Sequence, residues 1–254
     1  MTVILLRHGR STSNTAGVLA GRSEGVELDD RGREQAAGLV ERLADLPIRG
    51  LVCSPLLRCR RTVEPLAEAL SLEPVVDERL AEVDYGEWTG RKLGELMKEP
   101  LWRVVQAHPS AAVFPGGEGL AQVQARAVAA VRDHDRRIAS ENSGETAADS
   151  NGQHGPGHGG DALWLACTHG DVIKALLADA FGTHLDSFQR IMADPASVSV
   201  IRYTPVRPFV VHVNHTGPLL SGALRAKPST PDDTARSDAA SSDASDATVG
   251  GSTD

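Results

Sequence analysis

Apolar residues along this chain occur in two patterns, short continuous runs and longer stretches with helical spacing. The short runs predict strands at about 2–6, 50–53, 74–76, 162–167, 197–203 and 209–213. The longer stretches predict helices at about 30–46, 56–70, 91–107, 118–139 and 171–182. Alternation of this kind is typical of an α/β fold, in which a mostly parallel central sheet has helices on both faces. The last two strands flank a turn with two prolines, which predicts an antiparallel edge strand.

Two segments of the chain have almost nothing to bury. Residues from about 140 to 161 are rich in glycine, and residues 218–254 are rich in serine, alanine and aspartate. Such compositions predict a flexible insertion and a disordered tail, which leaves one domain over residues 1–217. His154 and His158 stand among glycine and proline residues, so a linker is favoured over a metal-binding tract.

Charge and cysteine content narrow the class of protein. The formal net charge of −8 argues against a general nucleic-acid-binding protein, although a cleft can be basic on an acidic surface. Cys53, Cys59 and Cys167 give no disulfide framework and are expected to be reduced core residues of a cytoplasmic protein. The sequence has no apolar run of membrane-spanning length and no basic leader before an apolar stretch. We therefore expect neither a membrane segment nor a signal peptide.

Basic side chains follow three of the predicted strands. Arg7 and His8 come directly after the first strand, and His169 follows the strand at 162–167. Arg58 lies in the first turn of the helix after the strand at 50–53. Because ligands bind beyond the carboxyl ends of strands in such sheets, these side chains are expected to meet in one crevice. The sequence therefore places two imidazole and two guanidinium groups at one edge of the sheet.

Six short motifs follow one another along the chain. They are Arg7-His8-Gly9 with Ser11 and Asn14; Leu28-Asp29-Asp30-Arg31-Gly32 with Gln35; Ser54-Pro55-Leu56 with Arg58 and Thr62; Leu80-Ala81-Glu82 with Gly86, Trp88 and Gly90; Pro115-Gly116-Gly117-Glu118; and Thr168-His169-Gly170. One short motif would carry little weight, but the ordered set is specific. From about residue 2 to about residue 216 the chain resembles the histidine phosphatase superfamily, in its phosphoglycerate-mutase-like or branched acid phosphatase group. The resemblance implies a phosphoglycerate-mutase-like fold.

The resemblance also implies roles for individual residues. His8 is expected to attack phosphorus and carry the phosphoryl group, with one ring nitrogen held by an acceptor, usually a main-chain carbonyl. Glu82 is expected to be the general acid and later the base, with Asp84 as its rival; His169 completes the catalytic set. A carboxyl group that donates a proton at neutral pH needs a raised pKa, so we expect Glu82 to be partly buried. The implied phosphate-binding residues are Arg7, Asn14, Arg58, His169 and Gly170.

Further residues are candidates for contact with the rest of the substrate. They are Arg10, Ser11, Arg22 and Glu118. Each long side chain has a second interpretation: Arg10 and Arg22 as solvated surface arginines, and Glu118 as a carboxylate at a helix N-terminus. Asp171 begins a helix beside the expected phosphate, so it should point away from the phosphate or bind another part of the substrate.

The predicted function is hydrolysis of a phosphomonoester of a small metabolite through phosphohistidine. Neither a metal nor another cofactor is needed, because arginines supply the positive charge. Two alternatives stay open, a phosphoglycerate-mutase-type phosphomutase and a non-catalytic sensor of a phosphorylated ligand. The short segment between Gly90 and Pro115, and Ser13 where the glycolytic mutases carry tryptophan, favour the phosphatase. The expected partner is the substrate alone, without nucleic acid or membrane; a homodimer stays open, and the substrate's identity is not predicted.

Overall fold

The structure, a computed structural model, describes residues 1–145 and 162–217. Its centre is a six-stranded sheet with the order β3-β2-β4-β1-β5-β6. The strands are β1 (Thr2–Arg7), β2 (Ile48–Cys53), β3 (Val75–Val76), β4 (Leu163–Thr168), β5 (Val198–Tyr203) and β6 (Pro208–His215). The four strands from β3 to β1 are mutually parallel, whereas β5 pairs antiparallel with both β1 and β6. The predicted mostly parallel sheet with an antiparallel edge is confirmed.

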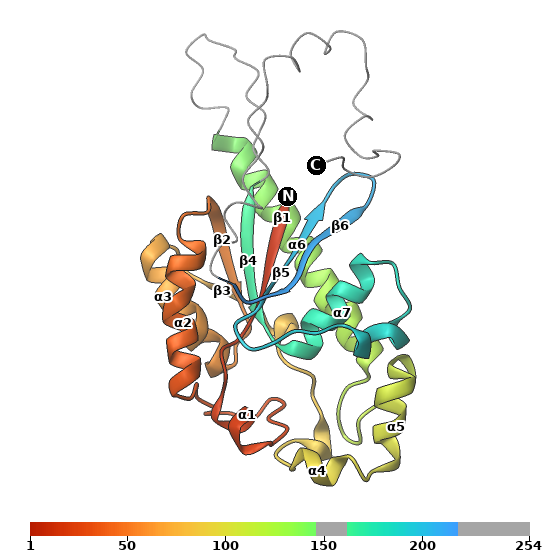
Figure 1. Ribbon diagram of the computed structural model, residues 1–254. Coiled ribbons are helices and arrows are strands. Elements are labelled where there is room, and N and C mark those ends of the chain that lie inside the picture. Colours follow the sequence, from red (N-terminus) through yellow and green to blue (C-terminus); the bar gives the residue numbers. More distant parts are fainter. Residues whose placement is uncertain (146–161, 218–254) are drawn as a thin grey trace, which may run out of the picture.

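Helices cover both faces of this sheet. The α-helices are α1 (Thr12–Ala16), α2 (Asp30–Leu43), α3 (Leu57–Leu70), α4 (Leu93–Leu96), α5 (Pro100–Ala107), α6 (Leu120–Glu145) and α7 (Gly170–Ala180). Short 3-10 turns lie at Glu78–Leu80, Gly86–Trp88, Pro109–Ala111 and Leu185–Arg190. Figure 1 shows α2 and α3 on one face, α6 and α7 on the other, and α1, α4 and α5 beyond the carboxyl end of β1.

The continuous apolar character of β1 reflects burial on both of its faces. Val3 and Leu5 belong to the hydrophobic cluster on the α6 and α7 side, whereas Ile4 and Leu6 belong to the cluster on the α2 and α3 side. All four side chains are fully buried. Because a strand that is covered twice has no solvent face, its sequence does not alternate, which explains the pattern from which the parallel sheet was predicted.

Two predicted helices end at other positions in the structure. The helix predicted over 91–107 is wrong as one element, since α4 ends at Leu96 and α5 starts afresh at Pro100. Proline has no N–H and its ring clashes with a preceding helical turn, so it starts a helix rather than continuing one. The helix predicted to end near 139 continues to Glu145.

Parts of the predicted organisation lie outside the described residues. They are the rest of the insertion from 146 to 161, including His154 and His158, and the tail from 218 to 254. Within the two ranges that the structure does describe, no helix is long and apolar enough to cross a membrane. Cys53, Cys59 and Cys167 are free thiols and fully buried, as expected for core residues.

Candidate active site

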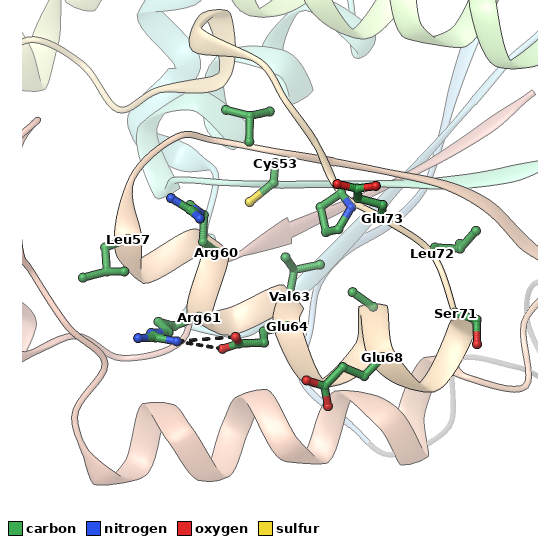
Figure 2. A pocket seen from close by; sticks show the side chains of 13 residues that line it. Cys53, Leu57, Arg60, Arg61, Val63, Glu64, Glu68, Ser71, Leu72 and Glu73 are labelled. Atoms are coloured by element: carbon green, nitrogen blue, oxygen red, sulfur yellow. Dashed lines mark hydrogen bonds and ion pairs between the residues drawn. The ribbon is translucent and has the colours of Figure 1, made fainter.

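Two hollows in the surface differ sharply in their chemistry. A groove of about 710 Å³ runs along α3 beside the edge strand β3. Figure 2 shows Arg61 and Glu64 paired there, with Nη1 and Oε2 3.1 Å apart and both side chains about half exposed. No histidine is among the residues that line this groove. Because its ion pair is solvated and no histidine lines it, the groove lacks the features expected of the phosphate site.

The second hollow, a cavity of about 390 Å³, lies at the carboxyl ends of the parallel strands. Its lining includes Arg7, His8, Ser11, Asn14, Arg58, Glu82 and Gly170. The sheet register explains why these motifs meet. Arg7 pairs with Thr168 across β1 and β4, so the next residues, His8 and His169, leave adjacent strands side by side with ring centroids 5.2 Å apart. Cys53 pairs with Cys167, which brings the start of α3 and Arg58 to the same edge.

His8 is arranged as a neutral nucleophile. Its ring is buried, and its Nδ1 lies 2.7 Å from the main-chain oxygen of Gly9. The predicted main-chain acceptor is therefore present, and a proton held on Nδ1 leaves Nε2 with a free lone pair. Burial, followed by the nearby charges of Arg58 and Arg7, holds the pKa of His8 well below its usual range. The imidazole is uncharged at neutral pH, as attack on phosphorus requires.

In both Arg7 and Arg58, one guanidinium nitrogen has a hydrogen-bond acceptor and another has none in the described protein. Nη1 of Arg7 donates to the carbonyl of Ala193 (2.5 Å) and Nη2 of Arg58 donates to the carbonyl of Gly21 (2.8 Å). Nε of Arg7 and Nη1 of Arg58 are buried and have no hydrogen-bond acceptor in the described protein. Burial of a charged donor without an acceptor costs free energy, so an anion that accepts hydrogen bonds from these two nitrogens would stabilise the site. A β-carbon on Gly170 would lie 3.3 Å from the Arg7 guanidinium, which explains glycine at that position.

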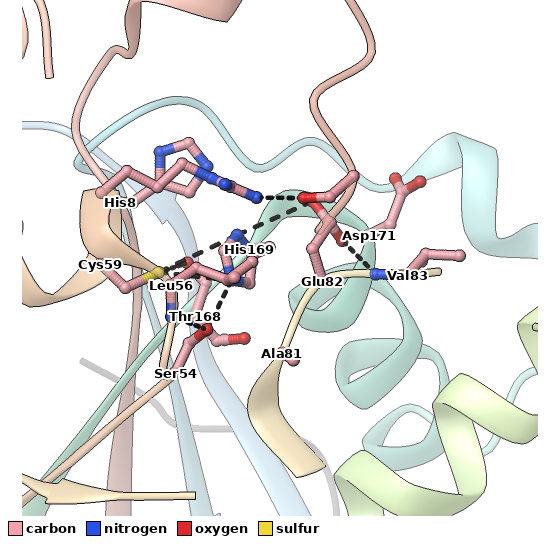
Figure 3. A network of polar contacts seen from close by, with 12 residues as sticks. His8, Ser54, Leu56, Cys59, Ala81, Glu82, Val83, Thr168, His169 and Asp171 are labelled. Atoms are coloured by element: carbon pink, nitrogen blue, oxygen red, sulfur yellow. Dashed lines mark hydrogen bonds and ion pairs between the residues drawn. The ribbon is translucent and has the colours of Figure 1, made fainter. Parts of the chain in front are cut away.

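His169 is fully buried at the N-terminus of α7, where helices favour anions. Figure 3 shows its ring between Ser54 and Glu82. A hydrogen bond joins the Ser54 hydroxyl to Nε2 (2.7 Å), and Nδ1 lies 3.9 Å from Oε2 of Glu82. Burial and the charge of Arg58 hold the pKa of His169 well below its usual range, so this ring is also neutral.

Glu82 has the environment of a proton donor. Glu82 is only 9% exposed, so its predicted burial is confirmed. Loss of solvation, followed by the charge of Asp171, raises the pKa of Glu82 to about 7 although Arg58 acts in the opposite direction. The rival carboxylate of Asp84 accepts the main-chain N–H of Gly86 (3.0 Å) and is not among the residues that line the cavity. Of these two carboxyl groups, Glu82 is therefore the one that lines the cavity.

A partly buried ion pair between Arg126 and Glu118 holds the segment that carries Glu82. Arg126 of α6 contacts both carboxylate oxygens of Glu118 and donates to the main-chain oxygens of Arg79, Ala81 and Glu82. Glu118 in turn accepts the N–H of Asp84 (3.0 Å). The sequence argument missed Arg126, because nothing along α6 distinguishes it from the other arginines of that helix.

A family model for the histidine phosphatase superfamily (branch 1) matches residues 3–216. The chain belongs to the histidine phosphatase superfamily. The match covers every motif from Arg7-His8-Gly9 to Thr168-His169-Gly170, and the predicted family is therefore confirmed.

Several histidine phosphatases and phosphoglycerate mutases are similar to the chain. Phosphoserine phosphatase 1 of Hydrogenobacter thermophilus is 28% identical over 217 residues, 84% of this chain and 92% of that protein. A probable phosphoglycerate mutase of Erwinia tasmaniensis is 34% identical over 129 residues, 50% of this chain and 59% of that protein. A mycobacterial glucosyl-3-phosphoglycerate phosphatase has a similar fold, with a TM-score of 0.70 and 24% identity over 84% of this chain and 98% of that one. The chain is thus an enzyme of the phosphatase and mutase class.

The predicted substrate contacts of this histidine phosphatase fall in different places. Ser11 and Asn14 line the cavity and cap α1 together, since the Asn14 amide oxygen accepts the N–H of Ser11 (3.0 Å). Arg10 pairs with Asp29 at 2.5 Å and lines a separate groove. Arg22 pairs with Glu118 at 2.9 Å. Arg10, Arg22 and Glu118 are thus absent from the lining of the phosphate cavity.

Asp171 and two residues that the sequence argument did not assign also belong to the lining of the cavity. Asp171, Lys174 and Tyr85 all line it. Asp171 accepts hydrogen bonds from the Tyr85 hydroxyl (2.7 Å) and from Nζ of Lys174 (3.2 Å). The prediction that Asp171 would avoid the phosphate or bind another part of the substrate is compatible with this position.

In the described ranges no group of three or more histidine, cysteine, aspartate or glutamate side chains is placed to hold a metal ion.

Proposed function

We propose that this histidine phosphatase hydrolyses a phosphomonoester of a small metabolite through a phosphohistidine on His8, without a metal. The observation that carries the proposal is the pair of orphaned donors, Arg7 Nε and Arg58 Nη1, in one cavity with a neutral His8. Transferred phosphoryl groups spread negative charge over three oxygens, and preorganised donors stabilise that charge. A ligand of this kind would satisfy both guanidinium atoms.

The first chemical step transfers the phosphoryl group to the enzyme. Nε2 of His8 attacks phosphorus in line and forms a P–N bond while the P–O bond of the ester breaks. The leaving alkoxide takes the proton of Glu82, whose pKa of about 7 leaves much of it protonated at neutral pH. Arg7 and Arg58 stabilise the charge on the phosphoryl oxygens.

The second step returns the enzyme to its starting state. Water attacks phosphorus, the P–N bond breaks, and the Glu82 carboxylate accepts the proton that the water loses. Inorganic phosphate leaves and His8 is again a neutral imidazole. Splitting one displacement into two steps lets the same pair of side chains serve both.

The charges of the cavity favour a phosphatase over a mutase. A mutase retains a bisphosphate intermediate, which needs cations for a second phosphate. Apart from Arg7 and Arg58, the only lysine or arginine among the lining residues is Lys174, which is paired with Asp171. The relative named phosphoserine phosphatase also aligns over most of its length, whereas the probable mutase aligns over 59% of its own. A sensor would need the arginines but neither His8 nor Glu82.

Phosphate release from a panel of phosphomonoesters in the presence of EDTA tests the proposal. Wild-type protein should release inorganic phosphate, and His8→Ala should lower the rate by at least about a thousandfold. His108→Ala is the matched control, because His108 is exposed and lies outside the cavity. Formation of an isomeric phosphoester would establish a mutase instead. Binding of phosphate analogues without either product would establish a sensor.

A further inference from the structure

Asp171 and Lys174 lie on one helix, α7, and line the same cavity as Arg7, His8 and Arg58. Gly170, where an added β-carbon would lie 3.3 Å from the Arg7 guanidinium, is the first residue of α7, and Asp171 follows it. Lys174 comes four residues after Gly170, on the same side of the helix and about one turn, ~5.4 Å, further along. All three residues line the cavity. With the phosphoryl group at His8, Arg7 and Arg58, the rest of the substrate would occupy the same cavity as this pair.

Lys174 has unused capacity for hydrogen bonding. Its ammonium donates to Asp171 Oδ1 (3.2 Å) and to Gln189 Oε1 (2.8 Å), and it lies 4.0 Å from the ring centre of Phe188. An ammonium has three N–H groups, so one has no acceptor within the described part of the chain. The side chain is 14% exposed, and its position over Phe188 fixes it at the cavity wall.

Asp171 can accept further hydrogen bonds. Its carboxylate accepts the Tyr85 hydroxyl (2.7 Å) and the Lys174 ammonium. A carboxylate offers about four lone-pair positions, so roughly half remain for a ligand. The other acidic residue of the lining outside the catalytic set, Asp194, already accepts the side-chain amide of Asn214 (2.8 Å). The lining thus presents one cation and one anion side by side.

This pair discriminates between classes of alcohol. A purely anionic group would gain from Lys174 but meet the charge of Asp171, and a purely cationic group would meet the reverse. A neutral alcohol would leave both charges without new partners. A group that carries an ammonium and a carboxylate on neighbouring atoms can place each against its opposite charge, while Asp171 and Lys174 stay paired.

We infer that the substrate's alcohol part is zwitterionic, as in an O-phosphorylated hydroxy amino acid, and that Asp171 and Lys174 select it. Asp171 accepts the substrate ammonium and Lys174 donates to the substrate carboxylate. The inference rests on the proposed function, because it assumes that the phosphoryl group lies at His8, Arg7 and Arg58. It adds a substrate class and two specificity-determining residues to that function.

The test compares kcat/KM for four phosphomonoesters that differ in charge: O-phosphoserine, phosphoethanolamine, 3-phosphoglycerate and glycerol 3-phosphate. Wild-type protein should prefer O-phosphoserine to each of the others. In Lys174→Met the ratio of O-phosphoserine to glycerol 3-phosphate should fall by about tenfold or more, because a charge-assisted hydrogen bond is lost. Lys174→Arg should keep part of the preference. Lys98→Met, an exposed lysine outside the cavity, should keep the wild-type ratio.

The outcomes separate this inference from the proposed function. Turnover of the panel without a preference for O-phosphoserine would overturn the inference alone. A preference that Lys174→Met leaves intact would assign the pair a purely structural role and overturn it as well. Failure of the wild type to release phosphate from any of the four esters would count against the proposed function and, with it, the inference.

Discussion

Two clusters of histidine, arginine and carboxylate side chains in this molecule differ in whether their charges are matched. In the Asp77 cluster (Asp77, Arg79, Asp133 and His134), Nε2 of His134 and Nη2 of Arg79 both lie 2.8 Å from Oδ2 of Asp77. Burial alone would raise the pKa of Asp77, but hydrogen bonds from Arg79 and His134 outweigh it and lower the pKa to about 2. The fold therefore stabilises the charged form of Asp77.

The proposed catalytic cluster, called the catalytic cluster below (Arg7, His8, Arg58, Glu82 and His169), contains similar residue types, but its charges are not matched in this way. Burial and nearby arginines lower the pKa of both histidines, burial raises the pKa of Glu82, and two guanidinium atoms lack acceptors in the described protein. Buried donors without acceptors and shifted pKa values destabilise the folded protein, and a bound ligand, rather than the fold, would offset that cost. We therefore expect substitutions in the catalytic cluster to lower turnover, and substitutions in the Asp77 cluster to lower stability.

The largest effect is expected for Arg58→Met. Removal of a preorganised donor to the phosphoryl oxygens should lower kcat by about a thousandfold. The melting temperature should stay the same or rise, because methionine fills a similar space without a buried charge that lacks a partner. Arg60→Met, two residues away on the exposed side of α3, is the matched control and should change neither quantity. A large fall in stability for Arg58→Met would place Arg58 with the structural arginines.

Glu82→Gln should lower turnover by about a hundredfold at pH 6, since an amide of the same size cannot donate the proton. The sign of the pH dependence follows from the raised pKa. Glu82 is protonated below about pH 7 and loses its proton as the pH rises through that value, so kcat/KM of the wild type should fall there. The variant should lose this limb of the profile, whereas Asp84→Asn should retain it. A limb that persists in Glu82→Gln would assign the proton donor to another group.

The smallest of these effects is the loss of stability expected for Asp77→Asn, about 2 kcal/mol at pH 7. A lowered carboxyl pKa contributes stability above the ordinary pKa of about 4 and loses it as the pH falls through about 2. The difference between wild type and variant in the free energy of unfolding should therefore shrink between these pH values. Turnover should change far less than in Arg58→Met. Asp30→Asn, at a side chain that is 94% exposed, serves as the control for stability.

Sequence reasoning placed residues most successfully where they are attached to the end of a strand. His8 and His169 follow β1 and β4 directly, so the order of elements alone brings them to one edge of the sheet. The double-sided burial of β1 was likewise visible as an unbroken apolar run. The break at Pro100 was missed, because the apolar spacing on either side of it fits a single helix.

Residues whose role depends on distant partners could not be predicted in this way. Arg126 donates hydrogen bonds to main-chain oxygens of residues more than forty positions away. Lys174 is held at the cavity by its contacts with Gln189 and Phe188. Arg10 shows the converse: its place in the first motif suggested a substrate contact, yet Asp29 holds it outside the cavity. Such pairings are set by tertiary packing, which local sequence does not encode.

The central claim is that His8 carries the phosphoryl group, and rapid quenching of a reaction with a ³²P-labelled aryl phosphate tests it most directly. An aryl leaving group needs little help from an acid, so Glu82→Gln should still be phosphorylated but should lack the base for hydrolysis. The account predicts an acid-labile, base-stable label that builds up in Glu82→Gln, maps to His8 and is absent from His8→Ala. Label on another residue, or turnover by His8→Ala at the wild-type rate, would contradict the account.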